Sequence, residues 1–147
     1  MRTEDWLAAC SVGLFALFSG MMSSMYGFMT DIPEDEYFGA FDADSKLLQF
    51  MSIGVAPAGI LAAISFLMSR QAGSLRVGVM ISAGGAAMLA GMAACSSYLP
   101  MIPEERLTPA VSLLPALFML LSIPVFAVGG ILAYPRRGRG ASGSRLA

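Results

Sequence analysis

Methionines are the residues of this chain best suited to binding a metal. The chain has 147 residues, of which twelve are Met, and Met21, Met25 and Met29 recur every four residues, on one side of a helix. Thioether sulfur binds the soft ion copper(I), so this row is a candidate copper site. Met is also an ordinary gap-filler in apolar cores. We expect core packing here and assign no metal-binding residue.

Carboxylates are concentrated in one segment, residues 31–44. It holds six acids around an aromatic group made of Tyr37, Phe38 and Phe41. Calcium prefers carboxylate oxygens, but a loop starting at Asp42 lacks the Gly at position six and the Glu at position twelve of an EF-hand. We expect a solvated loop whose rings rest on the membrane interface or on a partner subunit, and the sequence leaves these two open.

Groups for acid–base or redox chemistry are scarce. The chain contains no His, which removes the commonest metal ligand and general base. Cys10 and Cys95 form no C-x-x-C and are expected to be two reduced thiols packed as small apolar residues. We therefore predict no catalytic residue, no cofactor-binding residue and no cofactor, and we expect the protein not to be an enzyme.

Four apolar stretches make up most of the chain, at about residues 6–29, 47–68, 77–98 and 109–134, and none contains a charged residue. A helix rises about 1.5 Å per residue, so each stretch reaches across the roughly 30 Å of a bilayer core. The pattern predicts an all-α, polytopic integral membrane protein. Residues 1–134 would form a four-transmembrane-helix bundle, and residues 135–147 a basic disordered tail. The first span is too long for a signal peptide and is expected to be uncleaved.

Basic residues in the connections indicate the orientation. With both termini inside, seven Lys and Arg residues lie inside and two, Lys46 and Arg106, lie outside. This distribution obeys the positive-inside rule, so both termini are predicted to be cytoplasmic. The arginines of the tail are interpreted as a topology determinant or a contact to anionic lipid, with no nucleic-acid partner.

Small residues are concentrated in the middle spans. Thirteen of the 22 residues at 77–98 are Gly, Ala or Ser, with two rows at four-residue spacing: Ala83, Ala87, Gly91, Cys95 and Ala86, Ala90, Ala94. The second span has the row Gly54, Ala58, Ala62. Such rows let helices approach closely, so we expect spans two and three to be adjacent and tightly packed. Dimerisation or a pore lining is the alternative use of the third-span rows.

Two prolines near mid-membrane, Pro57 and Pro124, each remove a backbone hydrogen bond. We interpret them as kinks. The favoured function is a non-catalytic small membrane protein, an accessory or scaffolding subunit of a larger membrane complex. Its partners would be the lipid bilayer and other membrane subunits, or itself, through small-residue helix faces. The alternative is a small permease or channel for a neutral or weakly polar solute, using both prolines and lining serines at 52, 82 and 122.

Overall fold

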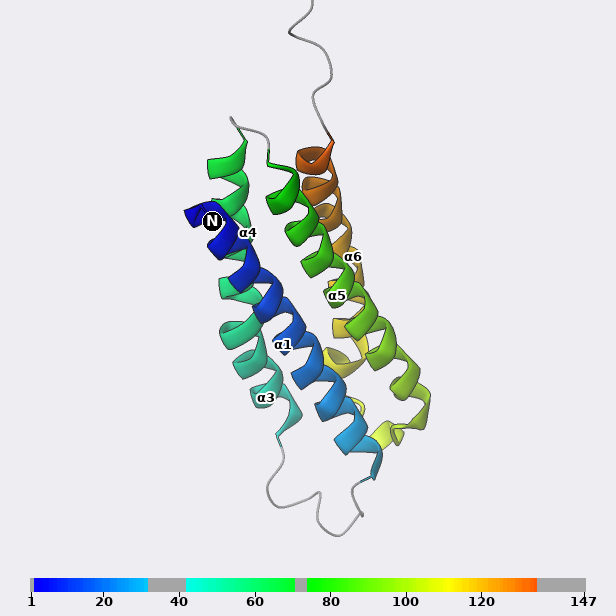
Figure 1. Cartoon of the computed structure of the whole chain (residues 1–147). Coiled ribbons are helices and arrows are strands. Elements are labelled where there is room, and N and C mark those ends of the chain that lie inside the picture. The colour runs from blue at the N-terminus through cyan, green and yellow to red at the C-terminus, as the bar shows by residue number, and fades with distance from the viewer. Residues whose placement is uncertain (1, 32–41, 71–73, 135–147) are drawn as a thin grey trace, which may run out of the picture.

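The computed structural model describes residues 2–31, 42–70 and 74–134 (Figure 1). Its helices are α1 (Thr3–Asp31), α3 (Ala43–Phe50), the π-helical turn η1 (Met51–Val55), α4 (Ala56–Ser69), α5 (Leu75–Tyr98), the 3-10 turns η2 (Leu99–Met101) and η3 (Glu104–Arg106), and α6 (Pro109–Ala133). The described part is all-helical, as predicted.

Four helical stretches are long and apolar enough to cross a membrane: Thr3–Asp31, Ala43–Ser69, Leu75–Met101 and Pro109–Ala133. The four predicted spans are therefore confirmed, with ends that differ by a few residues because the helices continue into polar residues such as Asp44 and Lys46. α1 begins and α6 ends at the same end of the bundle (Figure 1). The predicted tail, residues 135–147, and the aromatic group at 37–41 lie outside the described residues.

Side-chain caps fix where two of these helices begin. The Thr108 hydroxyl accepts a hydrogen bond from the Val111 N–H at 3.4 Å, and Pro109 occupies the first helical position, as the sequence predicts. The Ser74 hydroxyl caps α5 in the same way by accepting from the Val77 N–H. α6 ends at Ala133, just before Tyr134-Pro135, because the residue before a proline disfavours helix.

α1 and α5 are the two inner helices in the packing order of the bundle. α1 packs on α4 and α5, and α5 packs in turn on α6, whereas α4 and α5 touch each other only slightly. The expectation that spans two and three pack tightly together is therefore wrong. The short connection between them brings their ends together, but α1 occupies the space in front of both (Figure 1).

Hydroxyl groups of α1 bind the backbone of each of the other three spans. Ser11 donates to the Ala58 carbonyl of α4 at 2.8 Å, and Ser19 donates to the Ala87 carbonyl of α5 at 3.2 Å. Tyr26 donates to the Val111 carbonyl of α6 at 2.5 Å. Such bonds are favourable inside a membrane, where water offers no competing partner. They fix which face of α1 points inward.

Large side chains fill the interior between the helices. Phe18 of α1 and Phe118 of α6 meet edge to face, with ring centroids 5.1 Å apart. The largest side chains around them are fully buried: Phe15, Met22, Tyr26, Met29, Leu47, Met88 and Met92. The half of the bundle around Phe18 and Phe118 therefore has a packed core rather than a solvent-lined centre.

Pro57 has a local effect beyond a simple kink. The turn before it is widened to a π-helical turn, in which the Ala56 N–H bonds to the Met51 carbonyl five residues back. A wider turn gives the proline ring room that a regular helix lacks. Gly54 in this turn lies directly against Phe18, since a Cβ at Gly54 would be 2.8 Å from the Phe18 Cβ. The π turn thus coincides with a close approach of this span to α1.

Candidate interaction surfaces

The methionine row contributes mainly to the core. Met25 and Met29 are buried in the apolar cluster together with Met22, while Met21 is half-buried. Within residues 2–31, 42–70 and 74–134, no group of three or more His, Cys, Asp or Glu side chains is placed to hold a metal ion. The packing role expected for these methionines fits their position.

Serines proposed for a permease do not face a common space. Ser52 is exposed and donates to the Leu48 carbonyl of its own helix, and Ser122 is buried and donates to the Met119 carbonyl of α6. Ser82 lies at the α5–α6 contact, 3.5 Å from the Phe126 carbonyl. The prolines also differ, because Pro57 is half-buried and Pro124 is exposed. This arrangement gives little support to a shared binding cavity.

Cysteines occupy two different environments. Cys10 is exposed on the outward side of α1, and Cys95 is buried against Ser23, with its sulfur 3.8 Å from the serine oxygen. Both are free thiols. Cys95 packs as the sequence predicts, whereas Cys10 faces outward and not into the core.

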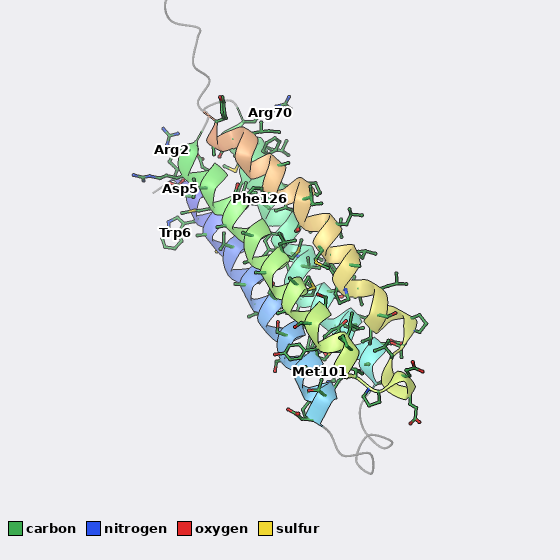
Figure 2. The ribbon with its side chains drawn as sticks, turned by 90° about the vertical axis from the view of Figure 1, so that its right-hand side faces the viewer. Arg2, Asp5, Trp6, Arg70, Met101 and Phe126 are labelled. Atoms are coloured by element: carbon green, nitrogen blue, oxygen red, sulfur yellow. The ribbon has the colours of Figure 1, made fainter. Side chains whose placement is uncertain are left out.

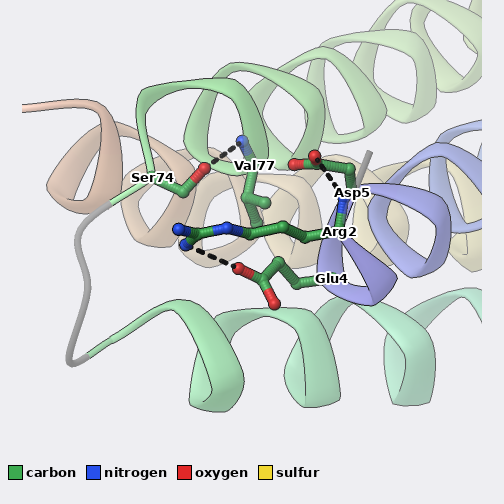
Figure 3. A network of polar contacts seen from close by, with 5 residues as sticks. All are labelled: Arg2, Glu4, Asp5, Ser74 and Val77. Carbon is green, nitrogen blue, oxygen red and sulfur yellow. Dashed lines mark hydrogen bonds and ion pairs between the residues drawn. The ribbon is translucent and has the colours of Figure 1, made fainter.

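Charged side chains lie at the ends of the bundle. Figure 2 shows Arg2, Asp5 and Arg70 at one end and Met101 at the other. The Arg2 guanidinium forms an ion pair with Glu4 at 3.5 Å, and the Arg2 backbone N–H donates a hydrogen bond to the Asp5 carboxylate (Figure 3). The Arg2 side chain is largely exposed, so this pair contributes little to stability. The cluster caps the start of α1 and marks the polar edge of the span.

Outward faces of the helices differ in the size of their side chains. Those of α4 and α6 carry large apolar side chains that suit lipid contact, including Ile60, Leu67, Leu113, Leu120 and Ile131. The outward face of α5 carries mostly Ala and Ser, whereas that of α1 mixes small residues with the large exposed side chains of Trp6, Leu17 and Phe28. Small side chains toward the outside of a bundle leave room for another helix to approach.

We call the outward side of α5 the alanine face; its exposed alanines are Ala83, Ala86, Ala90, Ala93 and Ala94, and Val79 and Leu89 are exposed beside them. The predicted row Ala86, Ala90, Ala94 thus points away from the bundle. The other row is divided: Gly91 and Cys95 pack on α1, and Ala83 is exposed. A Cβ at Gly91 would overlap Ser19, so the expected close packing at Gly91 is present, with α1 as the partner instead of span two. The Gly54, Ala58, Ala62 row is also buried, on its α1 side.

A second outward face, on α1, was missed by the sequence analysis. Gly13, Gly20 and Gly27 are spaced by seven residues, and a Cβ added at any of them would meet nothing within 4 Å. Leu17 and Ser24 lie between them, and Cys10 precedes Gly13, on the same side. We call these six residues the glycine seam. The seven-residue spacing is the signal from which it is predictable.

Two buried hydroxyls on α4, those of Ser65 and Ser69, have no hydrogen-bond partner among the described residues. Both side chains are fully buried on the inward face of the helix, one turn apart. An unsatisfied buried hydroxyl costs stability.

Comparison with known proteins gives no match: no family model, no curated protein and no solved structure is similar to this chain. Function must therefore be argued from the surfaces themselves.

Proposed function

We propose that this protein is a non-catalytic subunit of a larger membrane complex, which it joins through the alanine face of α5. The observation that carries the proposal is the contrast between this face and the Leu- and Ile-rich outward faces of α4 and α6. Association of helices in a bilayer depends on close backbone approach, which alanine permits and leucine does not.

The packed interior supports a subunit over a permease. Phe18, Phe118 and the buried methionines occupy the centre, and the serines that a permease would use are bound to backbone carbonyls. The protein is a multi-pass membrane protein in this proposal, with both termini cytoplasmic because seven of nine basic residues lie on that side.

Purification from native membranes in mild detergent tests the proposal. The tagged protein is expected to co-purify with one defined membrane polypeptide at fixed stoichiometry. The double variant Ala86→Leu, Ala90→Leu should lose that polypeptide. The matched control Ala116→Leu, Ala127→Leu makes the same change at two exposed alanines of α6 and should retain it. A chain that purifies alone, or a partner retained by both variants, would overturn the assignment.

A further inference from the structure

We propose that α3 is a hinged arm with two positions. In the position described above, the start of α3 is bound to α6. In the second position α3 closes on α1 and fills the groove between these two helices. The pivot is the π turn at Met51–Val55, which divides the second span into α3 and α4 (Figure 1). The alanine face of α5 takes no part, so the inference does not depend on the proposed function.

Three features make the second span easier to bend at the pivot. The π turn is a wide turn, closed by the bond from the Ala56 N–H to the Met51 carbonyl, and such turns are frequent at functional sites. Pro57, just beyond it, has no N–H to donate to the preceding turn. The Ser52 hydroxyl donates to the Leu48 carbonyl at 2.9 Å, a type of bond that often bends helices. Bending here therefore costs less than bending a regular helix.

The two sides of the pivot are held differently. α4 packs extensively on α1, and Gly54 of the π turn lies directly against Phe18. α3 packs only slightly on α1 and α6, and of its eight residues only Ala43 and Leu47 are buried. Lipid chains are as apolar as leucine, so moving these two side chains within the bilayer loses packing but little hydrophobic free energy. α3 can therefore move while α4 stays in place.

A polar bond holds the start of α3 on α6. The Asp44 carboxylate accepts a hydrogen bond from the Thr108 hydroxyl at 2.8 Å, and the same Thr108 oxygen accepts the Val111 N–H that caps α6. A hydroxyl donates one hydrogen bond while it accepts another, so the two bonds are compatible. We call the bond between Asp44 and Thr108 the latch. The latch is exposed, so water competes for both of its groups and it can open.

The groove between α1 and α3 provides the second position. Its volume is about 590 Å³, with Gly20 and Ser24 of the glycine seam on the α1 wall and Lys46 and Gln49 on the α3 wall. Asp31 is exposed two turns beyond Ser24 on the same side of α1, and neither Asp31 nor Lys46 forms an ion pair within the described part of the chain. Closing α3 on α1 brings these opposite charges together, so an ion pair replaces the latch. Exposed ion pairs are weak, which keeps the two positions close in free energy.

Disulfide trapping across the groove tests for the second position. Cys10 and Cys95 are replaced by serine, and cysteines are placed at Ser24 and Gln49, on opposite walls of the groove. A disulfide requires two Cα atoms within about 7 Å, so it traps the closed arm. In isolated membranes treated with copper-phenanthroline, Asp44→Ala should form this disulfide about tenfold faster than the parent, because it removes a hydrogen bond to a charged group.

Matched variants separate the latch from general effects on folding. Asp42→Ala removes a neighbouring acid whose side chain makes no cap bond to α3, and it should leave the rate unchanged. Lys46→Gln, added to Asp44→Ala, removes the ion pair of the closed arm and should slow the reaction again. Pro57→Ala restores an N–H donor at the pivot and should also slow it. Equal rates for Asp44→Ala and Asp42→Ala, a rate unaffected by Lys46→Gln or Pro57→Ala, or no disulfide in any sample would overturn the proposal.

Discussion

Gly129 and Gly130 are adjacent on α6. The structure predicts that replacing Gly129 by alanine lowers the stability of the fold and that replacing Gly130 by alanine raises it. A Cβ at Gly129 would overlap Ser82 Oγ and lie 2.5 Å from the Ser82 backbone nitrogen and 2.7 Å from the Gly78 carbonyl oxygen. A Cβ at Gly130 would meet nothing within 4 Å. The two substitutions are identical in chemistry and differ only in what they touch.

The loss of stability expected for Gly129→Ala follows from how close the added Cβ would lie to the backbone of α5. Ordinary contact begins at 3.4 Å, so α5 and α6 would have to separate by about 0.9 Å at a point where backbone, not a movable side chain, is in the way. Overpacking of this kind costs about 1–3 kcal/mol. The gain in helix propensity returns about 0.5–1 kcal/mol, leaving a net loss of stability of up to about 2.5 kcal/mol. Gly130→Ala keeps only the gain and should stabilise by about 0.5–1 kcal/mol.

Reversible unfolding of the purified protein in mixed detergent micelles measures both changes. Gly129→Ala should shift the midpoint toward lower denaturant, and Gly130→Ala toward higher. If the two variants shift in the same direction by equal amounts, α5 and α6 do not cross at Gly78 and Gly129, and the packing described for these helices is wrong.

The remaining predictions use the same unfolding assay except the last. Tyr26→Phe should destabilise by about 1 kcal/mol, because it removes the hydroxyl that binds the α6 backbone; an unchanged midpoint would refute that bond. Ser65→Ala and Ser69→Ala should each leave stability unchanged or raise it by up to about 1 kcal/mol, because each removes a buried hydroxyl that has no hydrogen-bond partner among the described residues. A loss of stability would show that the hydroxyl has such a partner. In intact cells, with Cys10 and Cys95 replaced, a cysteine at Ser74 should resist an impermeant thiol reagent and one at Ala40 should react; the reverse pattern would invert the topology.

The four spans were predictable because the signal is local. An uncharged apolar run of more than 20 residues is sufficient to identify a membrane helix, and the Thr108-Pro109 start of α6 is encoded in two residues. The π turn at Met51–Val55 was not predictable in the same way. Pro57 indicates a lost hydrogen bond, but whether the helix kinks or widens depends on Phe18 of another helix.

Helix partners were harder to predict than helix faces. Four-residue spacing identifies residues that share a side of a helix, but it does not say which helix that side meets. Gly91 is tightly packed as expected, yet against Ser19 of α1, and the row through Ala90 faces outward. The face through Gly13, Gly20 and Gly27 was not predicted, because its glycines lie two helical turns apart and the expected rows were those with four-residue spacing.

The central claim, that the alanine face of α5 is covered by another polypeptide, is tested most directly by photocross-linking in native membranes. A photoreactive residue at Ala90 should yield an adduct of one defined size with a different protein. The same residue at Leu120 of α6 should yield lipid adducts. Lipid adducts alone at Ala90, or the same set of adducts at both positions, would contradict the claim.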